Sequence, residues 1–118
     1  MDNKTEICHV DVALDMIVGK WKPHILQHLL SKGTLRFNEL RRLIPNITQR
    51  MLTLQLRELE EHAIIERVVY PVVPPKVEYS MTEYGKSLEP ILKAMHEWGT
   101  AHVLRQAEAK EREEAGLS

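Results

Sequence analysis

The sequence predicts a mainly α-helical domain with one small β-hairpin. Two patterns support this prediction: apolar residues recur at helical spacing as far as residue 62, and they alternate as in strands between residues 65 and 81. A chain of 118 residues is long enough for one domain. We expect that domain to span residues 1–107, and the mostly charged residues 108–118 to form a frayed or disordered tail.

The first predicted helix covers about residues 8–18 and is apolar on two sides. One of its two stripes contains Cys8, Val12 and Met16, each four residues after the one before. Because a short helix of this kind needs two neighbours, we expect one side to pack on its own domain and the other on a second copy of the chain. The next helix is expected to begin near Pro23, which suits a first helical position.

Two further helices form the outline of a helix-turn-helix. Asn38 is the predicted N-cap of a short helix that ends before Pro45, and Thr48 is the predicted N-cap of a helix over residues 49–62. A turn of about three or four residues between two such helices is typical of this motif.

Beyond Ala63 the spacing of the apolar residues changes from helical to strand-like. Residues 65–70 and 77–81 flank a proline-rich connection, which predicts a β-hairpin with a stiff tip. We expect the short segment Leu35–Phe37 to join one edge of this sheet. The hairpin would then be the wing of a winged helix-turn-helix.

Thr82 is predicted to cap the final helix. The apolar residues of this helix recur at alternating spacings of three and four, as in a coiled coil, and the stripe includes Met95 and Trp98. Pro90 lies inside the run and is expected to kink the helix.

Charge is divided unevenly along the chain. The net charge is −1, from 16 basic and 17 acidic residues. Residues 20–57 contain eight basic residues and one acidic residue, whereas the rest of the chain contains eight basic and sixteen acidic residues. The basic part covers the predicted helix-turn-helix, which favours a double-stranded DNA partner despite the nearly neutral total.

The helix over residues 49–62 has one face suited to the core and an opposite face suited to DNA. Three leucines share the first face, and Arg50, Leu54 and Arg57 lie on the other. Arginine can bind guanine through two hydrogen bonds, and glutamine can bind adenine in the same way. Lys76, at the predicted hairpin tip, is expected to touch a phosphate or the minor groove. The residues predicted to contact DNA are Arg36, Thr48, Gln49, Arg50, Thr53, Leu54, Arg57 and Lys76.

The sequence argues against several other classes of protein. No apolar run is long enough to span a membrane, and residues 1–6 do not open a secretory signal, so we expect a cytoplasmic protein. His24 and His28 lie four residues apart without a nearby cysteine or carboxylate, so no metal site and no cofactor are predicted. No motif of an enzyme active site is present, and nothing in the sequence identifies an effector.

Six segments together resemble a known family. They are Gly19–Trp21, Arg36–Leu40, Ile47–Thr53, Leu56–Glu60, Pro74–Thr82 and Trp98–Gly99. In this order they resemble the HxlR-type winged helix-turn-helix regulators, relatives of the MarR group, over residues 8–100. The resemblance implies a bacterial transcription regulator that binds a palindromic DNA operator as a homodimer, joined through its first and last helices. The residues expected in the interface are Val12, Met16, Met95 and Trp98.

The chain departs from this family at the end of the second helix of the motif. Members usually have glycine followed by leucine there, whereas this chain has Ala63 and Ile64. Without glycine a left-handed helix end is less favourable, so we expect the helix to end differently and to change the direction in which the hairpin begins.

Two questions stay open at the level of the sequence. Some members of the family sense oxidants or electrophiles through a cysteine near the start of the first helix, where Cys8 lies and where a helix amino end favours the reactive thiolate. The alternative is that Cys8 is a small buried apolar residue. For the whole chain, the alternative is a winged helix that binds proteins and no DNA, against which the basic outer face of residues 49–62 argues.

Overall fold

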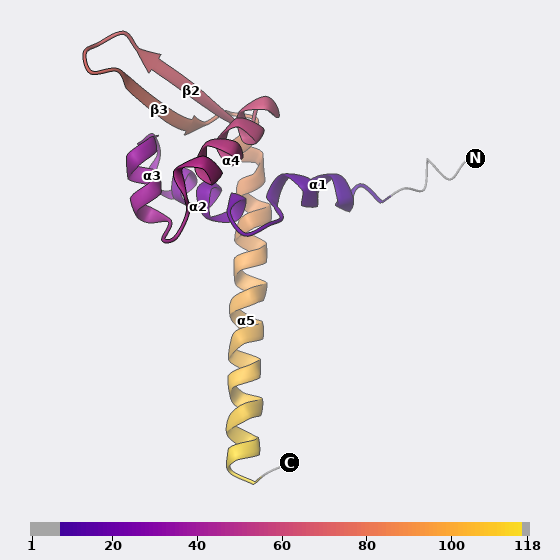
Figure 1. The fold of residues 1–118 in the computed structure, drawn as a ribbon. Helices are drawn as coiled ribbons and strands as arrows, with labels where there is room; N and C mark the ends of the chain where they lie inside the picture. The colour runs from indigo at the N-terminus through magenta and orange to yellow at the C-terminus, as the bar shows by residue number, and fades with distance from the viewer. Residues whose placement is uncertain (1–7, 117–118) are drawn as a thin grey trace. The chain divides into compact units, whose positions relative to one another are not determined.

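The computed structural model describes residues 8–116, in two compact units that meet between Lys86 and Ser87 and are considered separately (Figure 1). The elements in chain order are α1 (Val10–Ile17), α2 (Lys22–Lys32), β1 (Leu35–Arg36), α3 (Phe37–Leu43), α4 (Gln49–Glu61), β2 (Ile65–Tyr70), β3 (Lys76–Met81), the 3-10 helix η2 (Gly85–Leu88) and α5 (Glu89–Glu114). No helix of the described chain is long and apolar enough to cross a membrane.

The core of the first unit is built from the apolar faces of α2, α3 and α4 and from the sheet. Its most deeply buried large side chains are Ile25, Leu26, Leu29, Leu40, Leu52, Leu56, Leu59 and Ile65. Within the described residues, no polar or charged residue is buried. The three leucines of α4 that were expected to face the core are therefore confirmed, and this fixes which face of α4 is turned to solvent.

The sheet has three antiparallel strands in the order β1-β3-β2. Leu35 of β1 pairs with Tyr79 of β3, and β2 and β3 are paired from Ile65 and Met81 to Tyr70 and Lys76. The predicted hairpin and the edge strand before the helix-turn-helix are both present. In Figure 1 the hairpin projects beyond α3, with the loop between β2 and β3 at its free end.

The two helices of the motif begin differently from each other. At α4 the prediction is confirmed, since the Thr48 hydroxyl oxygen accepts a hydrogen bond of 3.0 Å from the backbone N–H of Met51. At α3 the predicted cap Asn38 is wrong, because the helix already begins at Phe37. Arg36 is its N-cap residue, and its backbone N–H donates to the Glu39 carboxylate at 2.8 Å. Asn38 consequently lies inside the first turn.

A left-handed residue ends α4 although no glycine is available. Ala63 has φ = 61°, and the backbone N–H of Ile64 donates to the carbonyl of Leu59 at 3.0 Å. The left-handed helix end is therefore present, and the expectation that α4 would end differently without glycine is wrong. The Cβ of Ala63 is sterically disfavoured in this region, so the turn carries a cost that glycine would remove.

Replacing Ala63 with glycine should therefore stabilise the protein, raising its free energy of unfolding by about 0.5–1 kcal/mol. Urea unfolding at fixed protein concentration measures the change. Ala109→Gly is the matched control, because Ala109 is exposed within α5 and the same substitution there should lower the free energy of unfolding by about 1 kcal/mol. If both substitutions lower the free energy of unfolding, or both raise it, the turn at Ala63 is not strained.

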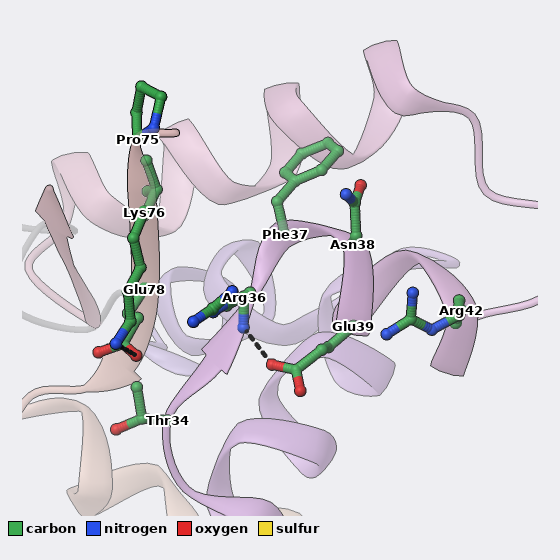
Figure 2. Close-up of a pocket in the computed structure, with 10 residues that line it drawn as sticks. Thr34, Arg36, Phe37, Asn38, Glu39, Arg42, Pro75, Lys76 and Glu78 are labelled. Carbon is green, nitrogen blue, oxygen red and sulfur yellow. Dashed lines mark hydrogen bonds and ion pairs between the residues drawn. The ribbon is translucent and has the colours of Figure 1, made fainter. Parts of the chain in front are cut away.

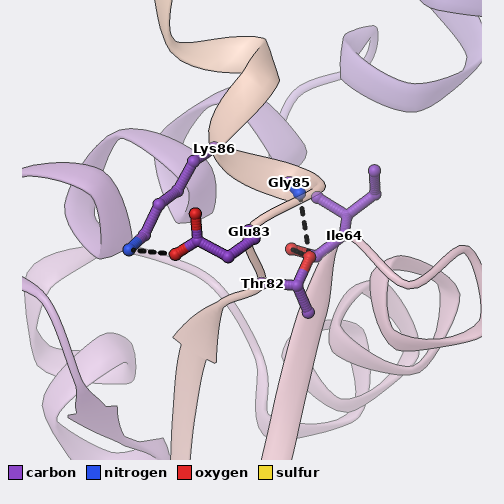
Figure 3. A network of polar contacts seen from close by, with 5 residues as sticks. All are labelled: Ile64, Thr82, Glu83, Gly85 and Lys86. Carbon is purple, nitrogen blue, oxygen red and sulfur yellow. Dashed lines mark hydrogen bonds and ion pairs between the residues drawn. The ribbon is translucent and has the colours of Figure 1, made fainter.

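Thr82 joins the end of β3 to the loop after α4 (Figure 3). Its hydroxyl oxygen lies 2.6 Å from the carbonyl oxygen of Ala63 and 3.1 Å from that of Ile64, and accepts a hydrogen bond of 2.8 Å from the backbone N–H of Gly85. Its own backbone N–H donates to the Ile64 carbonyl at 3.1 Å. Thr82 therefore closes a turn before η2 and does not cap the last helix, which begins at Glu89.

The last helix differs from its prediction at both ends. Pro90 lies in the first turn of α5, where its missing N–H is not needed, and so helps to begin the helix where a kink was expected. At the other end α5 continues to Glu114, into the stretch from residue 108 that was expected to be frayed or disordered. Alanine, glutamate, lysine and arginine, which make up most of this stretch, are all good helix formers.

Candidate nucleic-acid interface

The outer face of α4 is exposed and carries both of its arginines. Five of the eight residues predicted to contact DNA line one shallow hollow on this face: Gln49, Arg50, Thr53, Leu54 and Arg57. Leu54 is 47% exposed although it is apolar. The Thr53 hydroxyl donates to the carbonyl of Gln49 at 2.8 Å, so its proton is used within the helix. This face combines hydrogen-bond donors with apolar surface, as readout of base edges requires.

Some charged residues around α4 form an ion pair within the protein, and others are exposed to solvent. The Nζ of Lys22, on α2, lies 2.5 Å from a carboxylate oxygen of Glu58, and only 13% of the lysine side chain is exposed. This ion pair ties the C-terminal part of α4 to α2. Arg50 and Arg57 take part in no salt bridge within the described residues. Of the basic residues between positions 20 and 57, Lys22 is therefore used to hold α4 in place, whereas Arg50 and Arg57 are exposed.

A groove of about 350 Å³ separates α4 from the hairpin. Its lining residues are Phe37, Gln49, Thr53, Leu56, Arg57, Glu60, Arg67, Val77 and Tyr79. Arg67 on β2 extends the cationic surface from α4 to the hairpin, and it was not predicted. Its signal in the sequence was a charged residue in the otherwise apolar row of Ile65 and Val69. Burial raises the pKa of the Tyr79 phenol, which lines this groove.

A second, wider groove lies between the start of α3 and the hairpin (Figure 2). Its volume is about 710 Å³, and its lining residues are Thr34, Arg36, Phe37, Asn38, Glu39, Arg42, Pro75, Lys76, Val77 and Glu78. Arg36 and Lys76 were predicted, whereas Asn38 and Arg42 were not predicted as contacts. Phe37 and Val77 line both grooves. The face of α4, the two grooves and the hairpin therefore form one continuous surface.

Lys76 does not lie at the tip of the hairpin. It is the first residue of β3, opposite Tyr70, and its Nζ lies 3.3 Å from a Glu78 carboxylate oxygen and 4.8 Å from the centre of the Tyr70 ring. Glu78 also accepts a hydrogen bond from Tyr70, which raises the pKa of that phenol. The predicted wing cation is thus neutralised by a residue of its own strand. Thr48, the remaining predicted contact, is the exposed N-cap of α4.

The four residues expected in a dimer interface are all at least partly accessible. On α1, Val12 is 59% exposed and Met16 is partly buried. On α5, Met95 is 48% and Trp98 69% exposed, and the Trp98 ring stacks on His102 with 5.0 Å between ring centres. Large apolar surfaces of this kind on a monomer indicate a contact with another molecule.

Cys8 is exposed and free, and it precedes α1 without belonging to it. The alternative interpretation, in which Cys8 is a buried apolar residue, is not supported by this position. No group of three potential metal ligands occurs in the part of the chain that the structure describes.

Comparison with known sequences is consistent with this geometry. Residues 16–107 match the HxlR-like helix-turn-helix family. The uncharacterized HTH-type transcriptional regulator YdeP of Bacillus subtilis (strain 168) is 60% identical over 94 residues, which are 80% of this chain and 73% of YdeP. An uncharacterized HTH-type transcriptional regulator of Methanothermobacter thermautotrophicus is 51% identical over 112 residues, which are 95% of this chain and 85% of that protein.

Solved structures confirm the predicted fold class. The redox regulator HypR in its reduced form has a TM-score of 0.79 and 55% identity, over 84% of this chain and 99% of HypR. Its oxidized form has a TM-score of 0.74 and 58% identity, over 80% of this chain and 96% of HypR. A MarR-family regulator from Enterococcus faecalis V583 has a TM-score of 0.75 and 36% identity, over 92% and 94% of the two chains. This chain belongs to the HxlR-like helix-turn-helix family of transcriptional regulators.

Proposed function

We propose that this protein regulates transcription by placing α4 in the major groove of an operator in double-stranded DNA. The observation that carries the proposal is the outer face of α4, where Arg50, Leu54 and Arg57 are exposed while the opposite face is buried in the core. A helix enters the major groove side-on and reads base edges with such residues. Because this requires access to the chromosome, we place the protein in the cytoplasm.

The groove beside α4 and the groove at the start of α3 would hold the sugar-phosphate backbone of the same operator. Arg36 and Arg42 line one of them, and Arg67 lines the other. Contacts to phosphate position a protein on DNA without reading sequence, and they make affinity strongly dependent on salt. Lys76 would have to leave Glu78 to make such a contact, so we place it at the margin of this surface.

A homodimer would present two copies of α4 to successive major grooves of a palindromic operator, about 34 Å apart. The exposed apolar residues of α1 and of α5 supply the surface for such a contact, with Val12, Met16, Met95 and Trp98 as its proposed members. Light scattering during size-exclusion chromatography tests this assembly. A mass twice that of the 13.7 kDa chain is expected, and a monomer at micromolar concentration would contradict it.

DNA binding itself is tested by fluorescence anisotropy with a duplex from the region upstream of the protein's own gene. A scrambled duplex of the same length is the control. The upstream duplex should bind more tightly, and the logarithm of affinity should fall linearly with the logarithm of salt concentration between about 50 and 200 mM. Equal affinity for the two duplexes would contradict an operator in that region, and no binding at low salt would favour a module that binds only proteins.

We also propose that Cys8 makes the regulator responsive to oxidants or electrophiles. Cys8 is exposed just before α1, whose surface is part of the proposed dimer interface, and HypR, which this chain resembles over most of its length, is a redox regulator. Two Cys8 thiols, one from each subunit, could give two electrons to an oxidant and release two protons to form a disulfide between the chains. Alternatively, each Cys8 thiolate could attack an electrophile to form an adduct, or attack a small disulfide to form a mixed disulfide and release the other thiol.

Non-reducing electrophoresis after treatment with diamide tests this proposal. The chain contains a single cysteine, so a band of doubled mass that disappears with a reductant can only be a Cys8–Cys8 disulfide. Cys8→Ser is the matched control and should give no such band. If the wild-type protein forms neither this band nor a thiol adduct in mass spectrometry, the redox proposal is wrong while DNA binding is unaffected.

A further inference from the structure

The outer face of α4 has an apolar centre. Leu54 is 47% exposed, and among the exposed large apolar side chains of residues 8–116 it is the one that lies on α4. Thr53 precedes it and is half-buried, and both residues line the hollow on this face. A single exposed leucine is common on protein surfaces, so the state of its neighbour decides what this pair can bind.

The hydroxyl group of Thr53 is turned toward the backbone of its own helix. Its proton goes to the carbonyl oxygen of Gln49 at 2.8 Å, and the γ-methyl group must then occupy another staggered position on the Cβ. Thr53 therefore has no proton left to donate to the N7, O6 or O4 acceptors of the major groove. It offers a ligand its methyl group and a hydroxyl oxygen that can only accept.

Polar side chains flank this apolar pair along the helix. Arg50 precedes Leu54 by four residues and Arg57 follows it by three, so the three side chains lie on one face. Gln49 precedes Thr53 by four residues in the same way. Four residues of helix are about 6 Å long, and base pairs are about 3.4 Å apart. The apolar pair would therefore meet a base within about two base pairs of the one that Arg50 contacts.

Thymine is the base whose major-groove edge carries an apolar group. Its methyl group at C5 projects into the groove, whereas adenine, guanine and cytosine present hydrogen-bond donors and acceptors there. Apolar contact between a threonine methyl group and this thymine methyl is one of the usual pairings of side chain and base. The methyl group of Thr53 beside the exposed Leu54 matches the C5 edge of thymine better than any polar base edge.

We propose that Thr53 and Leu54 together bind the 5-methyl group of one thymine in each half of the operator. The inference rests on the proposed DNA binding by α4 and adds to it the base that the middle of α4 selects. Burial of one methyl group corresponds to about a fourfold change in affinity. Because a dimer makes the contact twice, the two thymines together contribute about fifteenfold.

Deoxyuridine tests the contact on the DNA, because it differs from thymidine only in lacking the 5-methyl group. In the duplex from the upstream region, each thymine is replaced in turn and the affinity is measured by fluorescence anisotropy. One position in each half-site should weaken binding by about fourfold, and changing both positions should weaken it by about fifteenfold. Thymines outside the half-sites are the control, and their replacement should leave the affinity within about twofold of the original.

5-Methylcytosine provides the reverse experiment at the sensitive position. Cytosine paired with guanine should bind more weakly there than thymine paired with adenine, because the methyl group is absent and the donors and acceptors differ. 5-Methylcytosine restores the methyl group alone and should therefore recover about fourfold of the loss.

Two substitutions of Thr53 separate its methyl group from its hydroxyl. Thr53→Ser keeps the hydroxyl and removes the methyl, so it should bind the operator about four- to fifteenfold more weakly and no longer distinguish thymine from deoxyuridine. Thr53→Val keeps the methyl and removes the hydroxyl, so it should bind within about twofold of the wild type and keep that distinction. Leu54→Ala should reduce the distinction as Thr53→Ser does. Because neither side chain belongs to the core, circular dichroism and urea unfolding should stay close to those of the wild type.

The outcomes distinguish this inference from the function on which it rests. If the wild-type protein prefers no duplex, the proposed function fails and the inference fails with it. If the protein prefers its operator but no thymine position responds to deoxyuridine, the methyl contact is overturned and the proposed function stands.

The protein variants add two further ways to overturn the inference. If Thr53→Val weakens binding as much as Thr53→Ser does, the hydroxyl oxygen accepts a hydrogen bond from a base and the methyl contact is wrong. If a thymine position responds to deoxyuridine equally in the wild type, in Thr53→Ser and in Leu54→Ala, a different residue contacts that methyl group.

Discussion

Replacing Arg50 with alanine should weaken binding to the operator by about 1–3 kcal/mol, which is about 5- to 150-fold in affinity, and relax the preference at one base position. Arg50 is exposed on the outer face of α4, between Gln49 and Leu54 in the same hollow. Its guanidinium group forms no salt bridge within residues 8–116, so no ion pair among them competes for its donors.

The expected loss comes from base readout and not from unfolding. Alanine is the best helix former, and position 50 lies in the first turn of α4, away from the buried leucines. The Arg50→Ala protein loses its bidentate contact to a guanine but keeps its contacts to phosphates. Its affinity for scrambled duplex should therefore fall much less than its affinity for the operator.

The measurement is anisotropy with the operator and with duplexes that each carry one changed base pair. Arg112→Ala is the matched control, because it removes the same charge from an exposed residue in the last turn of α5. The control should shift no base preference. If Arg50→Ala keeps both the affinity and the base preference of the wild type, α4 reads DNA without Arg50 and the assignment is wrong.

The sequence predicts those parts of the fold that local patterns determine. Apolar spacing places α4 and its buried leucines correctly, because one face of a helix must meet the core. It does less well at helix ends. The start of α3 depends on a hydrogen bond from the Arg36 backbone to the Glu39 carboxylate, and apolar spacing does not reveal such a bond. Pro90 is compatible both with a kink inside a helix and with the first turn of one, and in α5 it lies in the first turn.

The candidate site is predictable only where it lies on one helix. Gln49, Arg50 and Arg57 share a face by helical geometry alone, so the sequence identifies them. Arg67 joins them through the packing of the hairpin beside α4, and Lys76 meets Glu78 on the same face of a strand. The position of Arg67 beside α4 depends on tertiary packing, which the sequence does not show. The sequence also does not show whether Lys76 pairs with Glu78 or stays free for phosphate.

Replacing Gly85 with alanine should lower the free energy of unfolding by about 2–4 kcal/mol, the largest stability effect that we expect from a single methyl group. A Cβ at Gly85 would overlap the carbonyl oxygen of Ile64 and would lie 2.9 Å from its carbonyl carbon and 3.0 Å from the Cε of Met81. The methionine can move, but the carbonyl belongs to the backbone between α4 and β2.

The displaced carbonyl is also an acceptor that the junction needs. It accepts the backbone N–H of Thr82 at 3.1 Å, and the Thr82 hydroxyl in turn accepts the N–H of Gly85 at 2.8 Å. A shift large enough to admit the methyl group would stretch both bonds and move the end of β3 relative to the end of α4. Since the wing and α4 form the proposed DNA surface, operator affinity should fall together with stability.

Urea unfolding at fixed protein concentration gives the first effect, and anisotropy with the operator gives the second. Gly99→Ala is the matched control, because a Cβ there meets nothing within 4 Å beyond its chain neighbours and the nearby backbone of its own helix. Alanine is also the better helix former, so the free energy of unfolding should stay the same or rise by up to about 1 kcal/mol. A Gly85→Ala protein as stable as the control would show that the backbone at Ile64 can yield. The close contact between Gly85 and the Ile64 carbonyl would then not determine how the hairpin is oriented relative to α4.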